Sequence, residues 1–197
     1  MMPDAPGLEL IAQGIGDAHP GAVLGTYHEH DQACLIADPE QILAVLGWLR
    51  DTPGQEYRFL ASLHGVDYLP AEPRFGVVYE LLNRDRVERI RVKALLADPE
   101  QDVDHPIGSG GEAEQPTGIG SGRLPELASC VEMFPTADFQ EREVYDFFGI
   151  RFRGHPDLRR ILMPEVYVGW PQRRDFPIGG EPVIFTHNER VVPGWSQ

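Results

Sequence analysis

The chain has 197 residues, of which 42% are apolar and 24% charged, and its formal net charge is −14. This composition is typical of a globular domain with its own hydrophobic core, and the acidic balance argues against free nucleic acid as a partner. No apolar run approaches the length of a membrane span, and the first residues lack a signal-peptide pattern, so we expect neither insertion nor secretion. The two cysteines, Cys34 and Cys130, predict no metal cluster and no disulfide framework.

The N-terminal part of the chain predicts two helices around a β-hairpin. Residues 7–16 have a weak helical pattern of apolar residues, and residues 21–37 form two apolar runs separated by a polar turn. A clearer helix follows, with Asp38 as N-cap and Pro39 at the first helical position. Its apolar residues up to Leu49 fall on one face, which predicts packing on a sheet.

Three further strands are predicted before residue 98. Residues 57–69 are apolar enough for a buried strand, with Gly65 at a bulge or bend. Residues 74–82 and 90–96 alternate in polarity and predict a hairpin, whose second strand places Arg89, Arg91 and Lys93 on a solvated, basic face. No glycine-rich phosphate loop accompanies these strands, so a dinucleotide-binding fold is unsupported.

The middle of the chain contains a polar segment followed by a predicted helix. Residues 99–122 are dense in glycine, proline, serine and acidic residues, which predicts a flexible surface loop. Residues 124–134 then predict a helix with proline near its start, and Pro135 ends it.

The stretch Glu141–Gly149 combines more charge and aromatic character than any other. It predicts a short helix with Asp138 as N-cap, Glu141 completing a capping box, and Gly149 ending it in the left-handed conformation. Helical spacing separates an apolar stripe from the charged residues. The stripe consists of Val144, Phe147 and Phe148, and the charged residues that point elsewhere are Arg142, Glu143 and Asp146.

These acidic residues could be imagined as a metal or acid–base site. The candidates for a stand-alone metal-dependent hydrolase are Glu141, Glu143, Asp146 and His155, with Asp157 nearby. Glu141 and Glu143 diverge by about half a turn on a 3.6-residue helix, which does not favour a shared metal. Structural ion pairs are the preferred interpretation, and Arg159 or Arg160 could reach Glu143.

Residues 153–197 show neither helical nor alternating periodicity. Prolines recur through this segment, and it is rich in arginine and aromatic residues. A segment without its own core cannot fold alone, so it must lie along its own domain or along another protein. Its length and aromatic content favour another protein.

Several motifs resemble the C subunit (30 kDa-type subunit) of the proton-pumping NADH:quinone oxidoreductase, respiratory complex I. They are Glu-Arg-Glu-Val-Tyr-Asp-Phe-Phe-Gly-Ile at 141–150, Gly-His-Pro-Asp-Leu-Arg-Arg-Ile-Leu at 154–162 and Arg-Arg-Asp-Phe-Pro at 173–177. The strands at 59–68 and 75–82 also resemble that family. Trp170 and Gln172 stand where the family usually has histidine and leucine, and residues 102–122 look like an insertion.

The resemblance implies an α/β (α+β) fold, a two-layer sandwich with a mixed sheet and an extended C-terminal tail. The expected parts are a domain in residues 1–98 and 123–152, the loop 99–122, and a partner-binding tail in 153–197. The signature residues expected at the partner interface are Glu141, Arg142, Glu143, Asp146, His155, Asp157, Arg159, Arg160, Arg173, Arg174 and Asp175.

By the same resemblance the chain has no catalytic, cofactor-binding or metal-binding residues of its own. FMN, iron–sulfur clusters and quinone are expected in partner subunits, chiefly the quinone-site D subunit and the neighbouring iron–sulfur subunits. The complex would hold the chain at the cytoplasmic side of a bacterial membrane, with no direct membrane contact. An alternative is the equivalent subunit of a membrane-bound nickel–iron hydrogenase.

Overall fold

A five-stranded mixed sheet with strand order β1-β2-β5-β4-β3 organises the fold. The computed structural model describes residues 2–30, 32–99, 123–165 and 167–176. The strands are β1 (Val23–Glu29), β2 (Gln32–Ala37), β3 (Phe59–Asp67), β4 (Phe75–Asn83) and β5 (Glu88–Leu96). β2 and β5 pair in parallel, and the other neighbours are antiparallel. The predicted hairpins and the mixed sheet are therefore confirmed.

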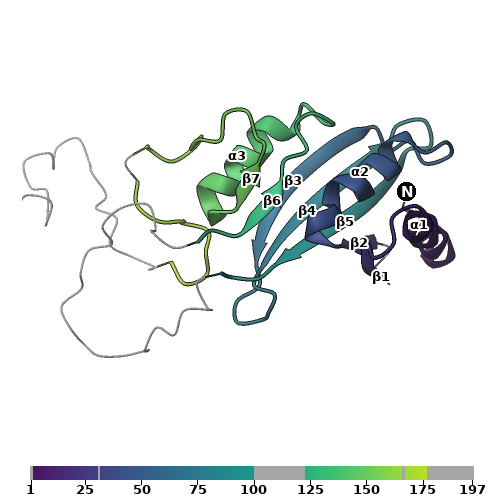
Figure 1. Cartoon of the computed structure of the whole chain (residues 1–197), viewed down its shortest axis with the longest axis horizontal. Coiled ribbons are helices and arrows are strands. Elements are labelled where there is room, and N and C mark those ends of the chain that lie inside the picture. Colours follow the sequence, from purple (N-terminus) through teal and green to yellow (C-terminus); the bar gives the residue numbers. More distant parts are fainter. Residues whose placement is uncertain (1, 31, 100–122, 166, 177–197) are drawn as a thin grey trace, which may run out of the picture.

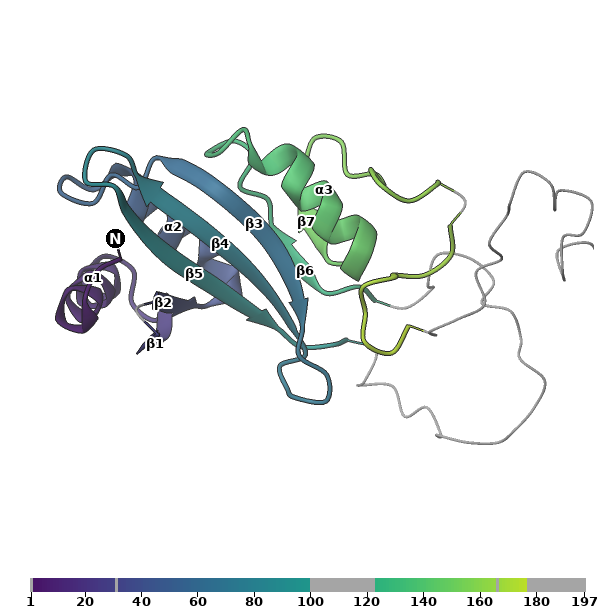
Figure 2. The same cartoon turned by 180° about the vertical axis from the view of Figure 1, so that it is seen from behind.

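The helices pack on one face of this sheet, which makes the two-layer sandwich that the sequence predicts (Figures 1 and 2). They are α1 (Ala5–Ala18), the short η1 (Pro39–Gln41) that leads into α2 (Ile42–Asp51), and α3 (Ala137–Phe148). The ring of Trp48 in α2 lies against Gly14, which joins α1 to α2. Among the described residues no helix is long and apolar enough to cross a membrane.

The core lies between the sheet and these helices. Alternate residues of the central strand β4 point into it, and α2 contributes one complete face, as its apolar spacing predicts. The fully buried side chains from these two elements are Phe75, Val77, Tyr79, Leu81, Ile42, Val45, Leu46 and Leu49. Removal of this apolar surface from water is the main force that stabilises the domain.

The opposite face of the sheet is less solvated than expected. Arg89 is exposed, but Arg91 is half-buried and donates to Glu80 at 2.5 Å. The amine of Lys93 lies 5.2 Å and 5.3 Å from the ring centroids of Tyr27 and Tyr68. The prediction of a wet, basic face is therefore wrong for two of its three residues, because long cationic side chains lie flat across the apolar sheet.

Gly65 has a different role from the predicted bulge. The irregularity of β3 falls between Leu60 and Ser62, and Gly65 is regularly paired with Val77. A Cβ atom on Gly65 would lie 2.6 Å from Cδ2 of Phe148 in α3. Glycine is needed here because α3 approaches β3 closely.

A second, two-stranded sheet replaces the helix predicted over residues 124–134. Strand β6 (Glu126–Ala128) pairs in parallel with β7 (Arg151–Arg153). Such short strands have no readable period, and the partner that binds their backbone groups comes more than twenty residues later. The predicted loop 99–122 lies outside the described residues, apart from Pro99.

Candidate functional site: the seat of the C-terminal tail

The start of α3 is fixed by a buried carboxylate rather than by a capping box. Glu141 is fully buried, and its oxygens accept the backbone N–H of Cys130 at 2.8 Å and the hydroxyl of Ser129 at 2.7 Å. The carboxylate of Asp138 lies 3.4 Å from Nε2 of His155, and no side chain caps the start of the helix, so the predicted capping role of both acidic residues is wrong. Burial raises the pKa of Glu141, and these donors only partly oppose the shift.

The C-terminal turn of α3 holds a second buried carboxylate. Asp146 accepts Nη1 of Arg160 at 2.6 Å and the backbone N–H groups of Ile161, Leu162 and Met163 at 3.0, 2.7 and 2.8 Å. Burial alone would raise the pKa of Asp146, but these four donors lower it below its usual range. Asp146 therefore stays ionised and holds the tail against the helix.

The tail also supplies the C-terminal cap of α3. The last four carbonyls of a helix have no partner within the helix, and cations are favoured beside them. The backbone N–H of Gly149 donates to the carbonyl of Tyr145 at 2.9 Å, and Nη1 of Arg160 donates to that of Asp146 at 3.0 Å. The backbone N–H of Gln172 donates to the carbonyl of Phe147 at 3.1 Å, and Nε of Arg173 donates to that of Phe148 at 2.8 Å. Gly149 has φ +69°, as its predicted left-handed conformation requires. Three of the four donors come from the tail.

Trp170 packs against the C-terminal end of α3, although it was not among the interface residues predicted from the sequence. It is 6% exposed and lies edge-on to Tyr145, with 5.3 Å between ring centroids. The guanidinium of Arg160 stacks 4.7 Å above its ring. A Cβ atom on Gly149 would lie 2.5 Å from Cε2 of Trp170. Gly149 therefore both ends the helix and makes room for the indole.

A buried arginine directly before β4 fixes the far end of the described tail. Arg74 pairs with Asp67 at 3.0 Å, with Asp98 at 2.7 Å and with Asp175 at 2.8 Å. The backbone N–H of Arg174 donates to Asp67 at 2.8 Å. Burial disfavours the charge of Arg74, but the carboxylates outweigh it and raise its pKa. The sequence did not predict that Arg74, Asp67 and Asp98 pair with one another, because their pairing joins three separate parts of the chain.

The remaining signature residues follow α3 along the start of the tail. Arg142 donates to the carbonyls of Arg159 at 3.3 Å and Arg160 at 3.2 Å. The predicted pairing of Glu143 with a tail arginine is wrong: Arg159 binds Asp157 at 2.9 Å, and Arg160 binds Asp146. Glu143 is exposed to solvent.

The tail up to Phe176 therefore lies on its own domain, contrary to the expectation that another protein would support it. The contacts run in register with α3: His155 lies beside Asp138, Arg160 beside Arg142, and Leu162 beside Asp146. This segment lacks a core, but the carboxylates and helix-end carbonyls of α3 bind its backbone and its arginines. Residues 177–197 lie outside the described part of the chain.

The acidic residues do not converge on a common point. Glu141 faces the loop after β6, Asp146 faces the tail, and Glu143 faces solvent. Among the described residues no group of three or more histidine, cysteine, aspartate or glutamate side chains could hold a metal ion. In the described part of the chain, Glu141, Glu143 and Asp146 therefore do not form the shared site that the hydrolase alternative requires.

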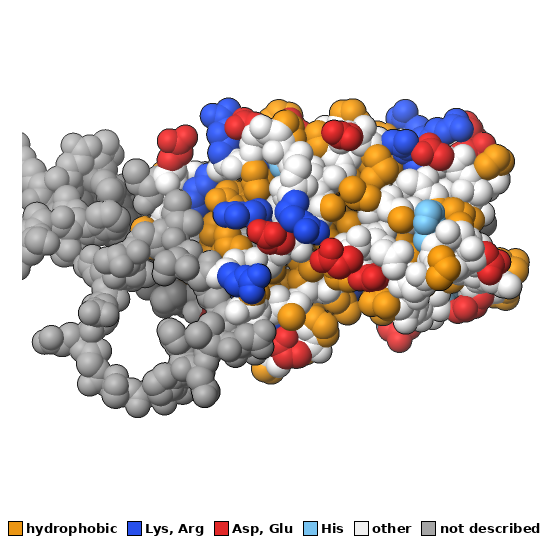
Figure 3. All heavy atoms as spheres, viewed as in Figure 1, with side chains coloured by type: hydrophobic (Ala, Val, Ile, Leu, Met, Phe, Trp, Pro, Cys, Tyr) orange, Lys and Arg blue, Asp and Glu red, His pale blue; other side chains and the backbone are white. Residues whose placement is uncertain are grey.

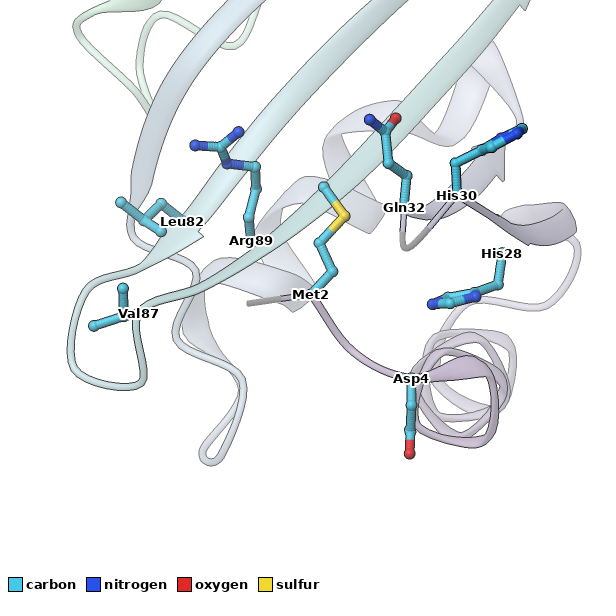
Figure 4. A pocket seen from close by; sticks show the side chains of 8 residues that line it. All are labelled: Met2, Asp4, His28, His30, Gln32, Leu82, Val87 and Arg89. Carbon is cyan, nitrogen blue, oxygen red and sulfur yellow. The ribbon is translucent and has the colours of Figure 1, made fainter.

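A shallow pocket lies near the N-terminus, apart from the tail (Figure 4). It contains His28 of β1 and His30, which follows β1, and none of the signature residues. Its lining consists of Met2, Asp4, His28, His30, Gln32, Leu82, Val87 and Arg89.

The fold recurs in two solved structures. The trypsin-resistant fragment 1–134 of Nqo5 matches with a TM-score of 0.53 and 26% identity, over 77% of this chain and 98% of that chain. A chain of an archaeal respiratory membrane complex, the membrane-bound sulfane sulfur reductase, matches with a TM-score of 0.59 over 86% of this chain and 85% of that chain. Its 20% identity supports likeness of fold alone. The protein thus has an α+β fold that also occurs in these two solved structures.

Sequence comparison identifies the family. The model of the respiratory-chain NADH dehydrogenase 30 kDa subunit matches residues 35–108 and 117–182. The C subunit of the NADH-quinone oxidoreductase of Herpetosiphon aurantiacus is 44% identical over 161 residues, 82% of this chain and 80% of the relative. The same subunit of Roseiflexus castenholzii is 40% identical over 172 residues, 87% and 85% of the two chains. The chain belongs to this 30 kDa subunit family, which confirms the predicted resemblance.

Proposed function

We propose that this chain is the C subunit of a proton-translocating NADH:quinone oxidoreductase and acts in it as a structural subunit. It packs on the quinone-site D subunit and on neighbouring iron–sulfur subunits, at the cytoplasmic side of a bacterial membrane. In this position it supports electron transfer from NADH through iron–sulfur clusters to quinone. FMN, the clusters and quinone lie in partner subunits. Family membership and the names of the relatives support this assignment over the hydrogenase alternative.

The observation that carries a structural role is the polar seat of the tail. In the described residues, Asp146, Glu141 and Arg160 bind main-chain groups, a hydroxyl group or an opposite charge within the same chain. Such contacts fix the position of a segment rather than perform chemistry. A tail that is ordered before assembly loses less conformational entropy when its partner binds. The domain therefore prepares the tail for docking.

Co-purification tests the proposal. A tagged full-length chain is extracted from membranes in mild detergent and isolated under native conditions. The expected result is a complex with NADH:quinone reductase activity that contains the quinone-site D subunit, flavin and iron. A chain that is recovered without these partners would contradict the assignment. Stoichiometric flavin or iron bound to the purified chain alone would contradict the placement of the cofactors in partner subunits.

A further inference from the structure

Two large apolar side chains stand exposed in this part of the molecule, one on α3 and one on the tail. Phe139 in α3 is 62% exposed and Leu162 in the tail is 60% exposed. The guanidinium of Arg142 lies 5.7 Å from the ring centroid of Phe139. Phe139, Arg142 and Asp146 follow at three- and four-residue spacing and so share one side of the helix. Asp146 binds the amide of Leu162, so this tail residue is anchored to the same side of α3.

We call Phe139, Arg142 and Leu162 the α3–tail surface. Its position is fixed by buried groups beneath it, because the carboxylate of Asp146 and the guanidinium of Arg160 are both buried. Hydrogen bonds to two tail carbonyls hold Arg142 in place. The surface is therefore rigid before any partner arrives. Figure 3 shows the helix side of the molecule, where apolar side chains lie among charges of both signs.

The charge of Arg142 is not balanced within the described part of the chain. Its hydrogen bonds go to neutral carbonyl oxygens, and no carboxylate of the described residues lies within ion-pair distance. The neighbouring arginines differ, since Arg159 pairs with Asp157 and Arg160 with Asp146. On a chain with net charge −14, a fixed cation without a carboxylate marks a place for an external one.

We propose that the α3–tail surface docks a protein surface that offers a carboxylate to Arg142 and apolar contacts to Phe139 and Leu162. This inference rests on the proposed function and takes the occupant to be a partner protein of the oxidoreductase. Arginine and aromatic side chains are enriched at the centres of protein interfaces, where apolar neighbours exclude water from the ion pair. Because the surface is already rigid, docking costs little ordering entropy.

Photo-cross-linking in the assembled complex tests the contact. Phe139→p-benzoylphenylalanine is introduced into the full-length chain, and Leu10→p-benzoylphenylalanine serves as the control. Leu10 is 69% exposed and belongs to α1, which lies at the opposite end of the sheet from α3 (Figure 1). Position 139 should cross-link to a partner subunit next to an acidic residue, and position 10 should not. No cross-link at 139, a cross-link to a second copy of this chain, or one to lipid would overturn the inference.

Substitution gives an independent measurement. Phe139→Ala combined with Leu162→Ala should lower the recovery of the chain in the complex by roughly five- to tenfold. Both side chains are exposed, so the folded domain should be retained, as circular dichroism of the purified variant can show. The matched pair Leu10→Ala and Leu24→Ala alters equally exposed residues and should leave recovery unchanged.

The two proposals fail in different ways. If the wild-type chain does not purify with the oxidoreductase, the proposed function is wrong. If the wild-type chain assembles and the Phe139/Leu162 double variant assembles equally well, the docking surface is wrong and the function stands. Arg142→Gln tests the ion pair: recovery of this variant should no longer depend on salt below about 0.15 M, the range where the Debye length exceeds about 8 Å. An unchanged salt dependence would contradict the carboxylate partner.

Discussion

The helix–sheet core and the tail seat are stabilised by opposite means. The core between α2 and the sheet is made of fully buried apolar side chains such as Leu46 and Val77. The tail seat is made of buried charges, with Asp146 and Arg74 at its two ends. Apolar burial is non-directional and insensitive to charge, whereas each buried charge depends on a specific partner. The tail should therefore detach from an intact core, but the core should not unfold beneath an intact tail.

The largest expected effect is the release of the tail from an intact core when the carboxylate of Asp146 is removed. Asp146→Ala leaves three backbone N–H groups without their acceptor and the buried Arg160 without its carboxylate partner, which should cost the docked tail about 3–5 kcal/mol. Trypsin cleavage after Arg159 should accelerate by at least about 100-fold, because cleavage follows the population of the open tail. Glu143→Ala on the same helix is the control and should change the rate less than about twofold. Equal rates for the two variants would refute the anchoring role of Asp146.

A cavity in the core should affect both regions together. Leu46→Ala removes a fully buried side chain from α2 and should lower the free energy of unfolding by about 2–5 kcal/mol. Leu43→Ala on the exposed side of α2 should cost under about 1 kcal/mol. Urea unfolding followed by circular dichroism, with trypsin sensitivity of the tail measured in parallel, checks this. A tail that stays protected from trypsin while the core unfolds would contradict the proposal that the docked tail requires a folded core.

The sequence predicts the helix–sheet core better than the tail seat, because only the core follows a local residue pattern. The spacing of Ile42, Val45 and Leu49 encodes a helix face locally, so the pattern alone predicts α2. Asp146 looks like a surface residue on a helical pattern, because nothing local shows that the chain returns to cover it. The strand Glu126–Ala128 is too short for any period and is formed by a distant partner. Contacts between remote polar groups leave no periodic trace in the sequence.

The junction between the regions can be tested with two glycines. Gly149→Ala places a methyl group in a left-handed residue and against Trp170. Gly154→Ala has the same backbone problem, with φ +85°, but no atom within 4 Å of the added methyl. Both should lose about 1–2 kcal/mol from backbone strain, and Gly149→Ala should lose about 1–3 kcal/mol more from the clash. Thermal unfolding of both variants measures the difference, and equal losses would exclude a tight seat for Trp170.

The smallest expected effect is on the pH dependence of folding stability, to which the two buried carboxylates of α3 contribute with opposite signs. The pKa of Asp146 is lower in the folded state than in the unfolded state, where it is about 3.9, so Asp146 stabilises the folded state at pH values above about 3.9. This stabilisation is lost as the pH falls through the pKa of the folded state. The raised pKa of Glu141 acts conversely: its contribution is complete below about pH 4 and is lost as pH rises through the folded value.

Glu141→Gln isolates the second carboxylate. The amide can accept from Cys130 and donate to Ser129, so the local contacts are kept. The variant should match the wild type in free energy of unfolding near about pH 4 and exceed it at about pH 8, as urea titrations at both values can show. A variant that is less stable at the higher pH would mean that the ionised form of Glu141 is the favoured one.

Hydrogen exchange of the full-length chain without partners tests most directly whether the domain seats its own tail. The amides of Ile161, Leu162 and Met163 donate to the buried carboxylate of Asp146. At about pH 7 they should exchange at least about 100-fold more slowly than in a free peptide, and Asp146→Ala should abolish this protection. Exchange at free-peptide rates until partner subunits are added would contradict a tail that is seated by its own domain.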